Sequence, residues 1–581
     1  MNPSTHSLEV YHSTRPPGLL ETKSSVPNEL YRADWRFLLP RLHYESMLYL
    51  GAPSELVLDV LIGMARRVTI AAGDTHTLKR LQAELRTPRH GNVQVLRVDP
   101  LRPLPLRSGA LELIVARGAE AGRLLRSRTC MAELSRLLSP GGCVYLEIDR
   151  IVDNFWLRAH IDEAGTHDFQ APRVLLPVYW NEILRLAVPR DDHDVARYCF
   201  THVVAGASRK GRTLQRVADV PVRMRLLPYL TPRRILLLER RGQPGESPPE
   251  TGPTRLRERP LQAANASEAA SRSALFARSG DDDNKVILLA FGRSKRPEMV
   301  LKIPRSTRYN RRLEHEHHCL TLLRERRAAD AGTYPEALFL DYHAGLAIHG
   351  QTMLHGAAFR NVTTCRTDCP HAASAVEWIT RLGEASAERV ASDTDDLGGW
   401  LSHIFQRFLQ VYSVSDTEAD FLDLRIDELR RAAHTLPRVF QHGDAGTPNA
   451  VVDEEGRVGF FDWEDGDPRG LPLWDLFNFI LCFGTWAGRV SGSRDDTLTY
   501  ERSFIEPSTL ARFQADAVAR YCDRVGVDRH LVEPLYFAHM LARSLRSGIR
   551  VGGDLGNTPV FQPLRLAIQH RSGRGLACMF G

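Results

Sequence analysis

The chain of 581 residues is long enough for two to four domains, each with a core of its own. Its composition, 43% apolar and 25% charged, is that of an ordinary globular protein, and a net charge of +6 spread along the sequence does not indicate nucleic-acid binding. Nine cysteines without a Cys-x-x-Cys pair predict reduced thiols and a cytoplasmic location, and no apolar run is uninterrupted enough to predict a membrane span.

Residues 1–33 are predicted to be a poorly ordered lead-in, and residues 34–240 a first domain in which strand and helix patterns alternate. Such alternation predicts a doubly wound, largely parallel α/β sheet. The predicted strands are Met47–Leu50, Val68–Ala71, Val93–Val98, Leu111–Ala116, Cys143–Ile148, Val217–Arg225 and Arg234–Glu239, and the predicted helices are Glu55–Arg67, Thr75–Leu85 and Cys130–Leu138.

This region resembles the class I S-adenosylmethionine-dependent methyltransferases. The resemblance is carried by Asp99–Leu106, before one predicted strand, and by Leu137–Gly142, which includes a predicted turn at residues 139–142 before the next. It implies a Rossmann-like fold that binds S-adenosylmethionine, with Gly51 after the first strand and Asp99 after the third as contacts.

The loop after the first strand departs from the methyltransferase pattern. That loop is glycine-rich in the family because the backbone must approach the cofactor closely. Here only Gly51 remains, Pro53 stiffens the loop and removes a donor, and Asp74 comes late for an acidic ribose ligand. Two interpretations therefore stay open: a cofactor-binding domain, or a methyltransferase-like fold kept for substrate recognition, docking or assembly.

Residues 241–273 are predicted to be a linker, because they are rich in Pro, Gly, Glu and Arg and lack apolar periodicity. A second domain is predicted over residues 274–581. Its first features are the strand Val286–Phe291 and the strand Met299–Ile303, in which the side chain of Lys302 points to a different face from its apolar neighbours.

The segment Arg311–Arg324 has the apolar spacing of a helix. Glu316 lies on the apolar face of that helix, with Leu313, Leu320 and Leu323. A carboxylate on such a face needs a partner, and Lys302 is the natural one.

A short hairpin is predicted after residue 449. Val451–Val452 and Val458–Phe461 are the predicted strands, and Asp453–Gly456 is the predicted turn. The outer ends of antiparallel strands lie roughly 5 Å apart, so Asn449 and Asp462 are expected side by side. Two oxygen ligands at that spacing suit Mg²⁺, which takes few protein ligands besides substrate phosphates.

The residues around this hairpin carry a second resemblance. His442-Gly443-Asp444-x-x-x-x-Asn449 and Asp462-Trp463-Glu464 are similar to the two signatures of the aminoglycoside phosphotransferase and choline kinase family. The resemblance implies an α+β, bilobal, protein-kinase-like fold with ATP and Mg²⁺ as cofactors. The implied roles are Lys302 on the ATP phosphates, positioned by Glu316, Asn449 and Asp462 as metal ligands, and Asp444 as catalytic base, with His442, Gly443 and Asp475 shaping the loop.

The sequence therefore predicts ATP-dependent phosphorylation of a small-molecule hydroxyl in a sugar, aminoglycoside or amino alcohol, by a protein with an accessory methyltransferase-like domain. Two alternatives stay open. One is a bifunctional methyltransferase and kinase that tailors a sugar or glycan, and the other is a non-catalytic scaffold.

Overall fold

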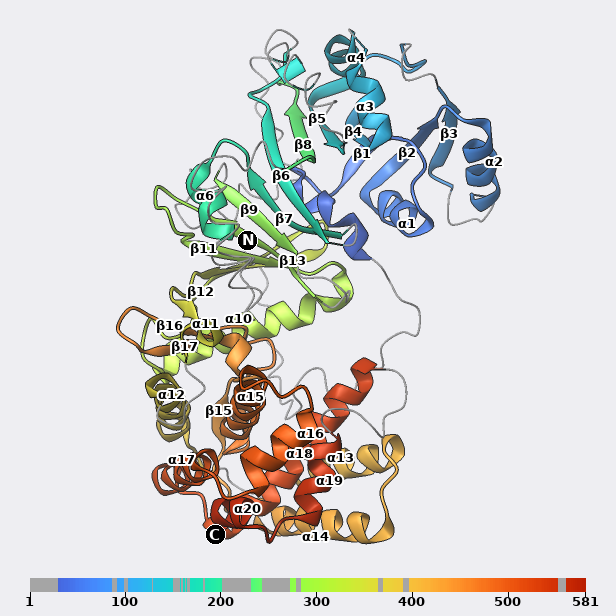
Figure 1. Cartoon of the computed structure of the whole chain (residues 1–581). Coiled ribbons are helices and arrows are strands. Elements are labelled where there is room, and N and C mark those ends of the chain that lie inside the picture. Colours follow the sequence, from blue (N-terminus) through green and yellow to red (C-terminus); the bar gives the residue numbers. More distant parts are fainter. Residues whose placement is uncertain are drawn as a thin grey trace, which may run out of the picture. The chain divides into compact units, whose positions relative to one another are not determined.

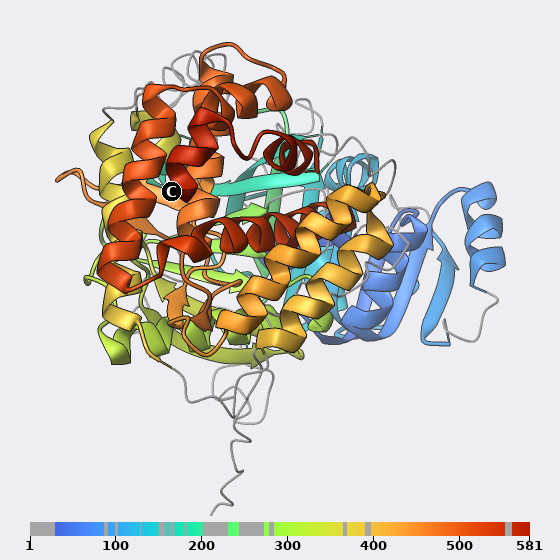
Figure 2. The same cartoon turned by 90° about the horizontal axis from the view of Figure 1, so that it is seen from below.

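The computed structural model describes residues 30–85, 91–98, 103–127, 129–149, 157, 160–161, 164, 168–180, 183–200, 231–242, 272–277, 284–363, 369–389, 397–551 and 561–581. Two compact units make up the chain. Val26–Glu314 and Ala337–Met353 form one, called here the sheet unit, and Met1–Ser25, His315–Glu336 and Leu354–Gly581 form the other, called the helical unit. Figure 1 and Figure 2 show strands dominating the first and helices the second. The predicted boundary at residues 273/274 lies inside the sheet unit.

The sheet unit holds a 13-stranded sheet with the order β12-β13-β11-β10-β9-β7-β6-β8-β5-β4-β1-β2-β3. Its strands are β1 (Tyr44–Leu50), β2 (Ala65–Ala72), β3 (Val93–Arg97), β4 (Leu111–Arg117), β5 (Leu138–Ile148), β6 (Arg173–Trp180), β7 (Ile183–Pro189), β8 (Arg234–Glu239), β9 (Ser273–Ala277), β10 (Val286–Ala290), β11 (Met299–Ile303), β12 (Ala337–His343) and β13 (Leu346–Thr352). Its helices are η1 (Leu30–Leu38), α1 (Glu55–Met64), α2 (Thr75–Glu84), α3 (Ala119–Leu125), α4 (Cys130–Leu137), α6 (His193–Tyr198) and η6 (Thr307–Tyr309), and α10 (Asn310–Arg326) begins here.

The first five strands pair in parallel, in the order β3-β2-β1-β4-β5, and helices separate β1 from β2, β2 from β3 and β4 from β5 in sequence. This confirms the predicted doubly wound sheet. Two boundaries were predicted wrongly: α1 ends at Met64, because β2 already begins at Ala65, and the predicted turn at residues 139–142 is the irregular start of β5. The predicted strand Val217–Arg225 lies outside the described residues.

Strands β6 and β7 form an antiparallel hairpin that the sequence analysis did not find. β6 pairs with β8, and β7 pairs with β9 through Leu186 opposite Phe276 and Ala187 opposite Leu275. Strands β9, β10, β11, β13 and β12 continue from there in antiparallel order. The methyltransferase-like strands and the Lys302 strand therefore belong to one hydrogen-bonded sheet.

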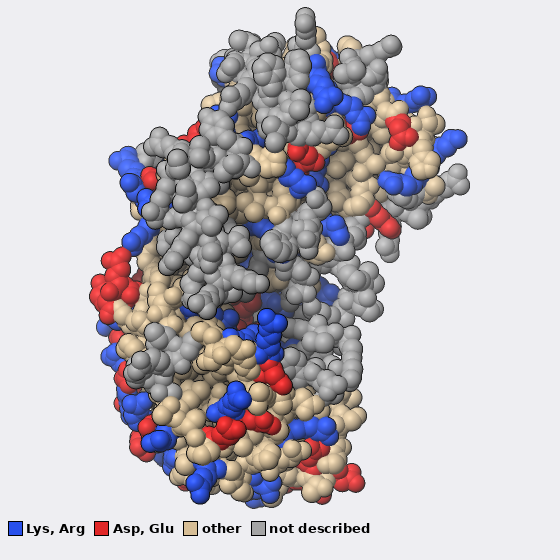
Figure 3. Space-filling view, viewed as in Figure 1, with Lys and Arg blue, Asp and Glu red and all other residues tan. Residues whose placement is uncertain are grey.

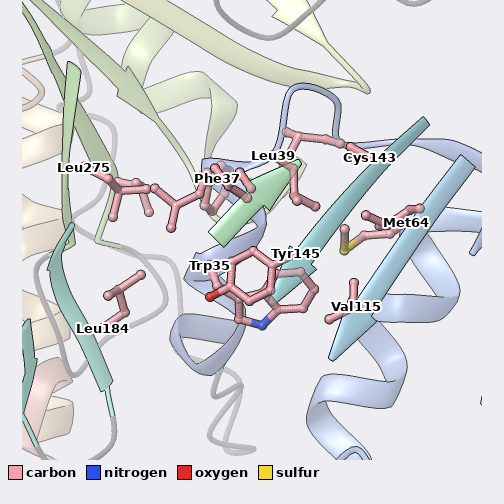
Figure 4. Packing of buried hydrophobic residues seen from close by; sticks show 14 of the residues in the cluster. Trp35, Phe37, Leu39, Met64, Val115, Cys143, Tyr145, Leu184 and Leu275 are labelled. Atoms are coloured by element: carbon pink, nitrogen blue, oxygen red, sulfur yellow. The ribbon is translucent and has the colours of Figure 1, made fainter. Parts of the chain in front are cut away.

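One apolar core lies along this sheet. It includes Trp35 and Tyr145, whose rings are 4.9 Å apart, and it extends through Leu184 and Leu275 to Leu301 on β11 (Figure 4). Buried side chains on both sides of the β7–β9 pairing thus share one cluster. Burial of this kind is the main favourable term in folding, so the two parts of the sheet stabilise each other.

A buried ion pair adds to this core. The guanidinium of Arg305, two residues after β11, donates from Nε and Nη2 to the Asp34 carboxylate at 2.9 and 2.7 Å, and both side chains are fully buried. Arg305 Nη1 donates to the Asn284 carbonyl at 2.7 Å, and Arg36 Nη2 donates to the Arg305 carbonyl at 2.6 Å. Residues 271 positions apart are therefore fixed in one place.

The helical unit is built from helices around two small sheets, β14-β16-β17 and β15-β18. Helices α13, α14 and α18 pack on one another, and α13 and α14 are the neighbouring gold helices of Figure 2. Besides the end of α10, the elements are β14 (Ala357–Ala358), α11 (Phe359–Val362), α12 (Pro370–Ser386), α13 (Leu397–Val411), α14 (Asp416–Ala432), β15 (Val439–Gln441), η7 (Thr447–Asn449), β16 (Ala450–Val452), β17 (Val458–Phe460), β18 (Asp467–Gly470), α15 (Trp474–Val490), α16 (Asp496–Tyr500), η8 (Glu501–Ile505), α17 (Thr509–Val525), η9 (Arg529–Leu531), α18 (Val532–Val551), α19 (Phe561–Gln569) and α20 (Arg574–Phe580).

Basic and acidic side chains are intermingled on the face of the helical unit drawn in Figure 3. Among the described residues, no helix combines the length and the apolar character that crossing a lipid bilayer requires. The apolar helix α15 is largely buried inside its unit.

Candidate active site

Asp444 lies in the loop between β15 and η7, and its side chain is partly exposed. Its Oδ2 accepts a hydrogen bond from Asn449 Nδ2 at 2.9 Å, and its Oδ1 accepts one from Asn478 Nδ2, on α15, at 3.1 Å. Asn449 Nδ2 also donates to the Asp444 carbonyl at 3.1 Å. Amide donors on both oxygens fix the plane of the carboxylate and leave further acceptor positions for a hydroxyl group.

The predicted hairpin is present and brings the predicted metal ligands close in the fold. Ala450 pairs with Phe460 across β16 and β17, and the Phe461 amide donates to the Asn449 carbonyl at 3.0 Å. Asp462 follows directly and has a positive φ of 75°, which few non-glycine residues adopt. Non-glycine residues in such sparsely populated backbone conformations cluster at functional sites.

The buried carboxylate of Asp475 holds the start of the loop. It accepts hydrogen bonds from the backbone amides of His442 at 2.6 Å and Gly443 at 2.9 Å. Burial raises the pKa of Asp475, and the nearby His442 ring and the hydrogen bonds from these two amides oppose that rise. Gly443 has φ +80°, and a Cβ there would lie 1.8 Å from the Asp465 carbonyl oxygen, so only glycine fits. The loop-shaping roles proposed for these residues agree with this geometry.

Glu316 connects helix α10 to the second signature. Its side chain is fully buried, and its Oε1 accepts a hydrogen bond from the Trp463 amide at 3.2 Å. The Trp463 ring packs 4.6 Å from that of His442, between centroids. The helix carboxylate therefore positions the segment that begins with Asp462.

Lys302 lies on β11, in the sheet unit, and only 3% of it is exposed. It pairs in register with Ile287 of β10 and His349 of β13. A buried ammonium group requires an anionic or hydrogen-bonding partner. The predicted Lys302–Glu316 pair joins residues of different units and stays a prediction.

The predicted S-adenosylmethionine contacts are placed only in part. Gly51 directly follows β1 and has φ +108°, and a Cβ there would lie 3.0 Å from Cγ of Glu120, so this acidic side chain lies directly beside the backbone of the loop. A cavity lined by Leu50 and Leu104 has a volume of about 20 Å³, room for a single water molecule. Asp99 lies outside the described residues. The predicted S-adenosylmethionine contacts therefore stay a prediction, and we derive no methyl transfer from them.

Three arginines near Asp444 were missed by the sequence analysis. Arg543 Nη1 donates to Asn478 Oδ1, and Arg546 Nη1 donates to the Gly443 carbonyl at 3.2 Å. Both lie on α18, about a hundred residues after the loop. Arg360, on α11, donates from Nε to the Thr447 hydroxyl at 2.9 Å. No sequence motif marks these three positions.

Comparison with known proteins supports the second resemblance by sequence. Residues 277–523 match the phosphotransferase enzyme family. Among curated proteins, none matches this chain. The family-matched residues span the end of β9, the Lys302 strand, the Asp444 loop and α15.

Solved structures resemble each half of the chain. The aminoglycoside phosphotransferase APH(3'')-Id of Streptomyces rimosus, in complex with ADP and streptomycin, has 15% identity and a TM-score of 0.31, covering 50% of this chain and 97% of its own. A SAM-dependent methyltransferase of Aquifex aeolicus has 14% identity and a TM-score of 0.22, covering 26% and 83%. An rRNA methylase of Streptococcus thermophilus has 9% identity and a TM-score of 0.22, covering 37% and 93%.

Proposed function

We propose that the residues that match the phosphotransferase enzyme family, 277–523, transfer the γ-phosphoryl group of ATP to a hydroxyl of a small molecule. The observation that carries the proposal is the convergence on one loop of Asp444, Asn449 and the hairpin end that leads to Asp462. These are the residue types that phosphoryl transfer requires, because such enzymes act mainly by positioning and electrostatic stabilisation.

The side chains present fit a magnesium ion. Asn449 uses its amide Nδ2 to bind Asp444, which leaves its Oδ1 as the remaining polar atom, and Asp462 supplies a carboxylate. Hard oxygen ligands of this kind suit Mg²⁺. Asn449 and Asp462 would hold the ion, whose chemistry is to neutralise charge on the phosphate oxygens.

Asp444 is the proposed base. Its carboxylate is held by Asn449 and Asn478, and it would accept the proton of the acceptor hydroxyl as the oxygen bonds to phosphorus. The backbone that carries it is fixed by Asp475. Lys302, positioned by Glu316 as in related kinases, would bind the ATP phosphates.

The test is ATP consumption by the full-length protein with a panel of sugars, aminoglycosides and choline-like alcohols. Asp444→Asn is expected to lower kcat by about 10²- to 10⁴-fold, the contribution of a positioned base, while ADP binding persists. Asp420→Asn, at an exposed position on α14, is the matched control and should keep full activity. If Asp444→Asn turned over ATP as fast as the wild-type protein, the assignment of Asp444 as base would be refuted. If neither protein turned over ATP with any acceptor, the result would favour a non-catalytic scaffold.

A further inference from the structure

Two arginine side chains, Arg360 and Arg543, contact residues in or next to the Asp444 loop. Arg543 Nη2 lies 3.9 Å from Cys482 Sγ, and the same sulfur lies close enough to Arg360 to influence its guanidinium. Arg543 reaches the proposed base through one intermediate, since Asn478 contacts both Arg543 and Asp444. Arg360 contacts Thr447, three residues after Asp444. Each arginine therefore contacts a residue that either binds the Asp444 carboxylate or belongs to the Asp444 loop.

The partners of these two guanidinium groups are neutral. Arg360 donates to a threonine hydroxyl, and Arg543 to an amide oxygen and a thiol. Within the described ranges, no carboxylate forms an ion pair with either, whereas Arg546 lies 3.6 Å from Asp465. Both side chains are only partly exposed. Partial burial of a charge without a counter-ion is costly, and an arginine guanidinium is the group that best matches a carboxylate or phosphate.

The environment of Arg360 points the same way. Burial lowers its pKa, the proximity of Arg489 lowers it further, and Cys482 opposes this. A cation in surroundings that disfavour its charge is a candidate binding group for an anionic ligand. Asp444 does not fill that role, because its carboxylate accepts from Asn449 and Asn478 and forms no ion pair with a guanidinium among the described residues.

We propose that the hydroxyl acceptor carries an anionic group, a carboxylate or a phosphate, which Arg360 and Arg543 bind while its hydroxyl faces Asp444. This deepens and rests on the proposed function. It predicts that polycationic aminoglycosides are poor acceptors, because their ammonium groups would approach two unneutralised guanidinium groups.

The first experiment compares acceptors that share one skeleton: D-glucuronate, D-glucose 6-phosphate, D-glucose and D-glucosamine, with kanamycin A as a polycation. It is joined by a wider set of hydroxy acids and sugar phosphates. The acceptors that are turned over should be anionic, and the carboxylate and phosphate arms identify which anion is preferred. Faster turnover of neutral or cationic acceptors, lost in Asp444→Asn, would refute this inference and leave the proposed function standing.

The second experiment does not require a known acceptor. Melting of the full-length protein is followed with saturating ADP and Mg²⁺, so that the nucleotide phosphates are already in place, while tartrate or inorganic phosphate is titrated. Anion-dependent stabilisation is expected in the wild-type protein and in Arg512→Gln, an exposed control on α17, and is expected to disappear in Arg360→Gln and Arg543→Gln. Identical titrations in all four proteins would refute the inference. Anion binding without any ATP turnover would support the anion site and refute phosphotransfer.

A kinetic readout separates binding from folding. Arg543→Gln is expected to raise KM for the anionic acceptor by roughly 10- to 100-fold, the value of a charge-assisted hydrogen bond, with KM for ATP unchanged. Arg543→Lys, which keeps the charge without the planar fork, should recover part of that loss. A rise in KM for ATP instead would mean that Arg543 binds nucleotide phosphates, and it would overturn the inference.

Discussion

Substitution of Asp34 by alanine is expected to destabilise the sheet unit more than any exposed substitution. The change removes the carboxylate and leaves the fully buried Arg305 guanidinium without this counter-ion, although its Nη1 still donates to the Asn284 carbonyl. Arginine cannot lose its proton to escape that cost. Breaking a buried pair by removing one partner costs about 3 to 5 kcal/mol. For a unit of about 300 residues, an unfolding entropy near 2 cal/mol/K per residue converts this to a fall of roughly 5 to 8 °C in Tm.

The reciprocal substitution, Arg305→Met, should cost less at mildly acidic pH. Burial raises the pKa of Asp34 even with the guanidinium present, so the carboxyl group can take up a proton once Arg305 is gone. Replacement of both residues, as Asp34→Leu with Arg305→Met, should return most of the lost stability, because a well-packed apolar pair replaces a buried ion pair at little net cost.

Denaturant unfolding of the four proteins, followed by a probe in the sheet unit, measures these values. The matched control is Asp191→Ala, whose carboxylate lies 3.3 Å from Arg190 but is 78% exposed, and it should change the unfolding free energy by less than about 1 kcal/mol. A loss below about 1 kcal/mol for Asp34→Ala would refute the reasoning, since the pair would then contribute no more than a surface contact.

Three further predictions concern the helical unit. Gly443→Ala should lower the unfolding free energy by roughly 2 to 4 kcal/mol in a melting experiment, because its Cβ would overlap the Asp465 carbonyl; wild-type stability would show that the loop adjusts freely. Asp475→Ala leaves the backbone amides of His442 and Gly443 without their acceptor, which should lower the unfolding free energy by roughly 1 to 3 kcal/mol for each amide. The substitution should therefore reduce both Tm and kcat, and a change in kcat alone would contradict the structural role. Burial, and to a smaller extent the nearby arginines of α18, hold the pKa of His539 well below its usual value. The His539 side chain therefore stays neutral in the folded protein at a pH where it binds a proton in the unfolded chain. Stability should therefore fall as pH drops below about 6.5, by up to roughly 1.4 kcal/mol per pH unit, and urea unfolding of His539→Phe should lack that slope.

The elements that the sequence predicted best are those whose partners lie close by in the chain. The β16–β17 hairpin closes within a few residues, and its turn residues and alternating pattern are sufficient to place Asn449 beside the residues leading to Asp462. Lys302 was also placed correctly on its strand from the local pattern. Its low exposure of 3% could not be predicted, because it depends on neighbouring elements that the alternation along one strand does not identify.

Contacts between distant residues were beyond such reasoning. Arg543 reaches the Asp444 loop because α18 packs against α15, and nothing in the α18 sequence distinguishes that face from a solvated one. The β6–β7 hairpin consists of two apolar runs two residues apart, but Pro177 within the first argues against a central strand. The Asp34–Arg305 pair links residues 271 positions apart and has no local signature.

The pairing of β7 with β9 determines how this protein can be divided. Residue 277, where the family match begins, is the last residue of β9, so a fragment cut there would lose that strand. A fragment that begins at residue 273 would keep β9 but lose its partner β7, and the edge of this short, apolar and normally buried strand would be exposed. Unprotected strand edges of this kind recruit other chains and lead to aggregation. The phosphotransferase portion is therefore not a transferable module, and insolubility of either fragment would say nothing about its chemistry.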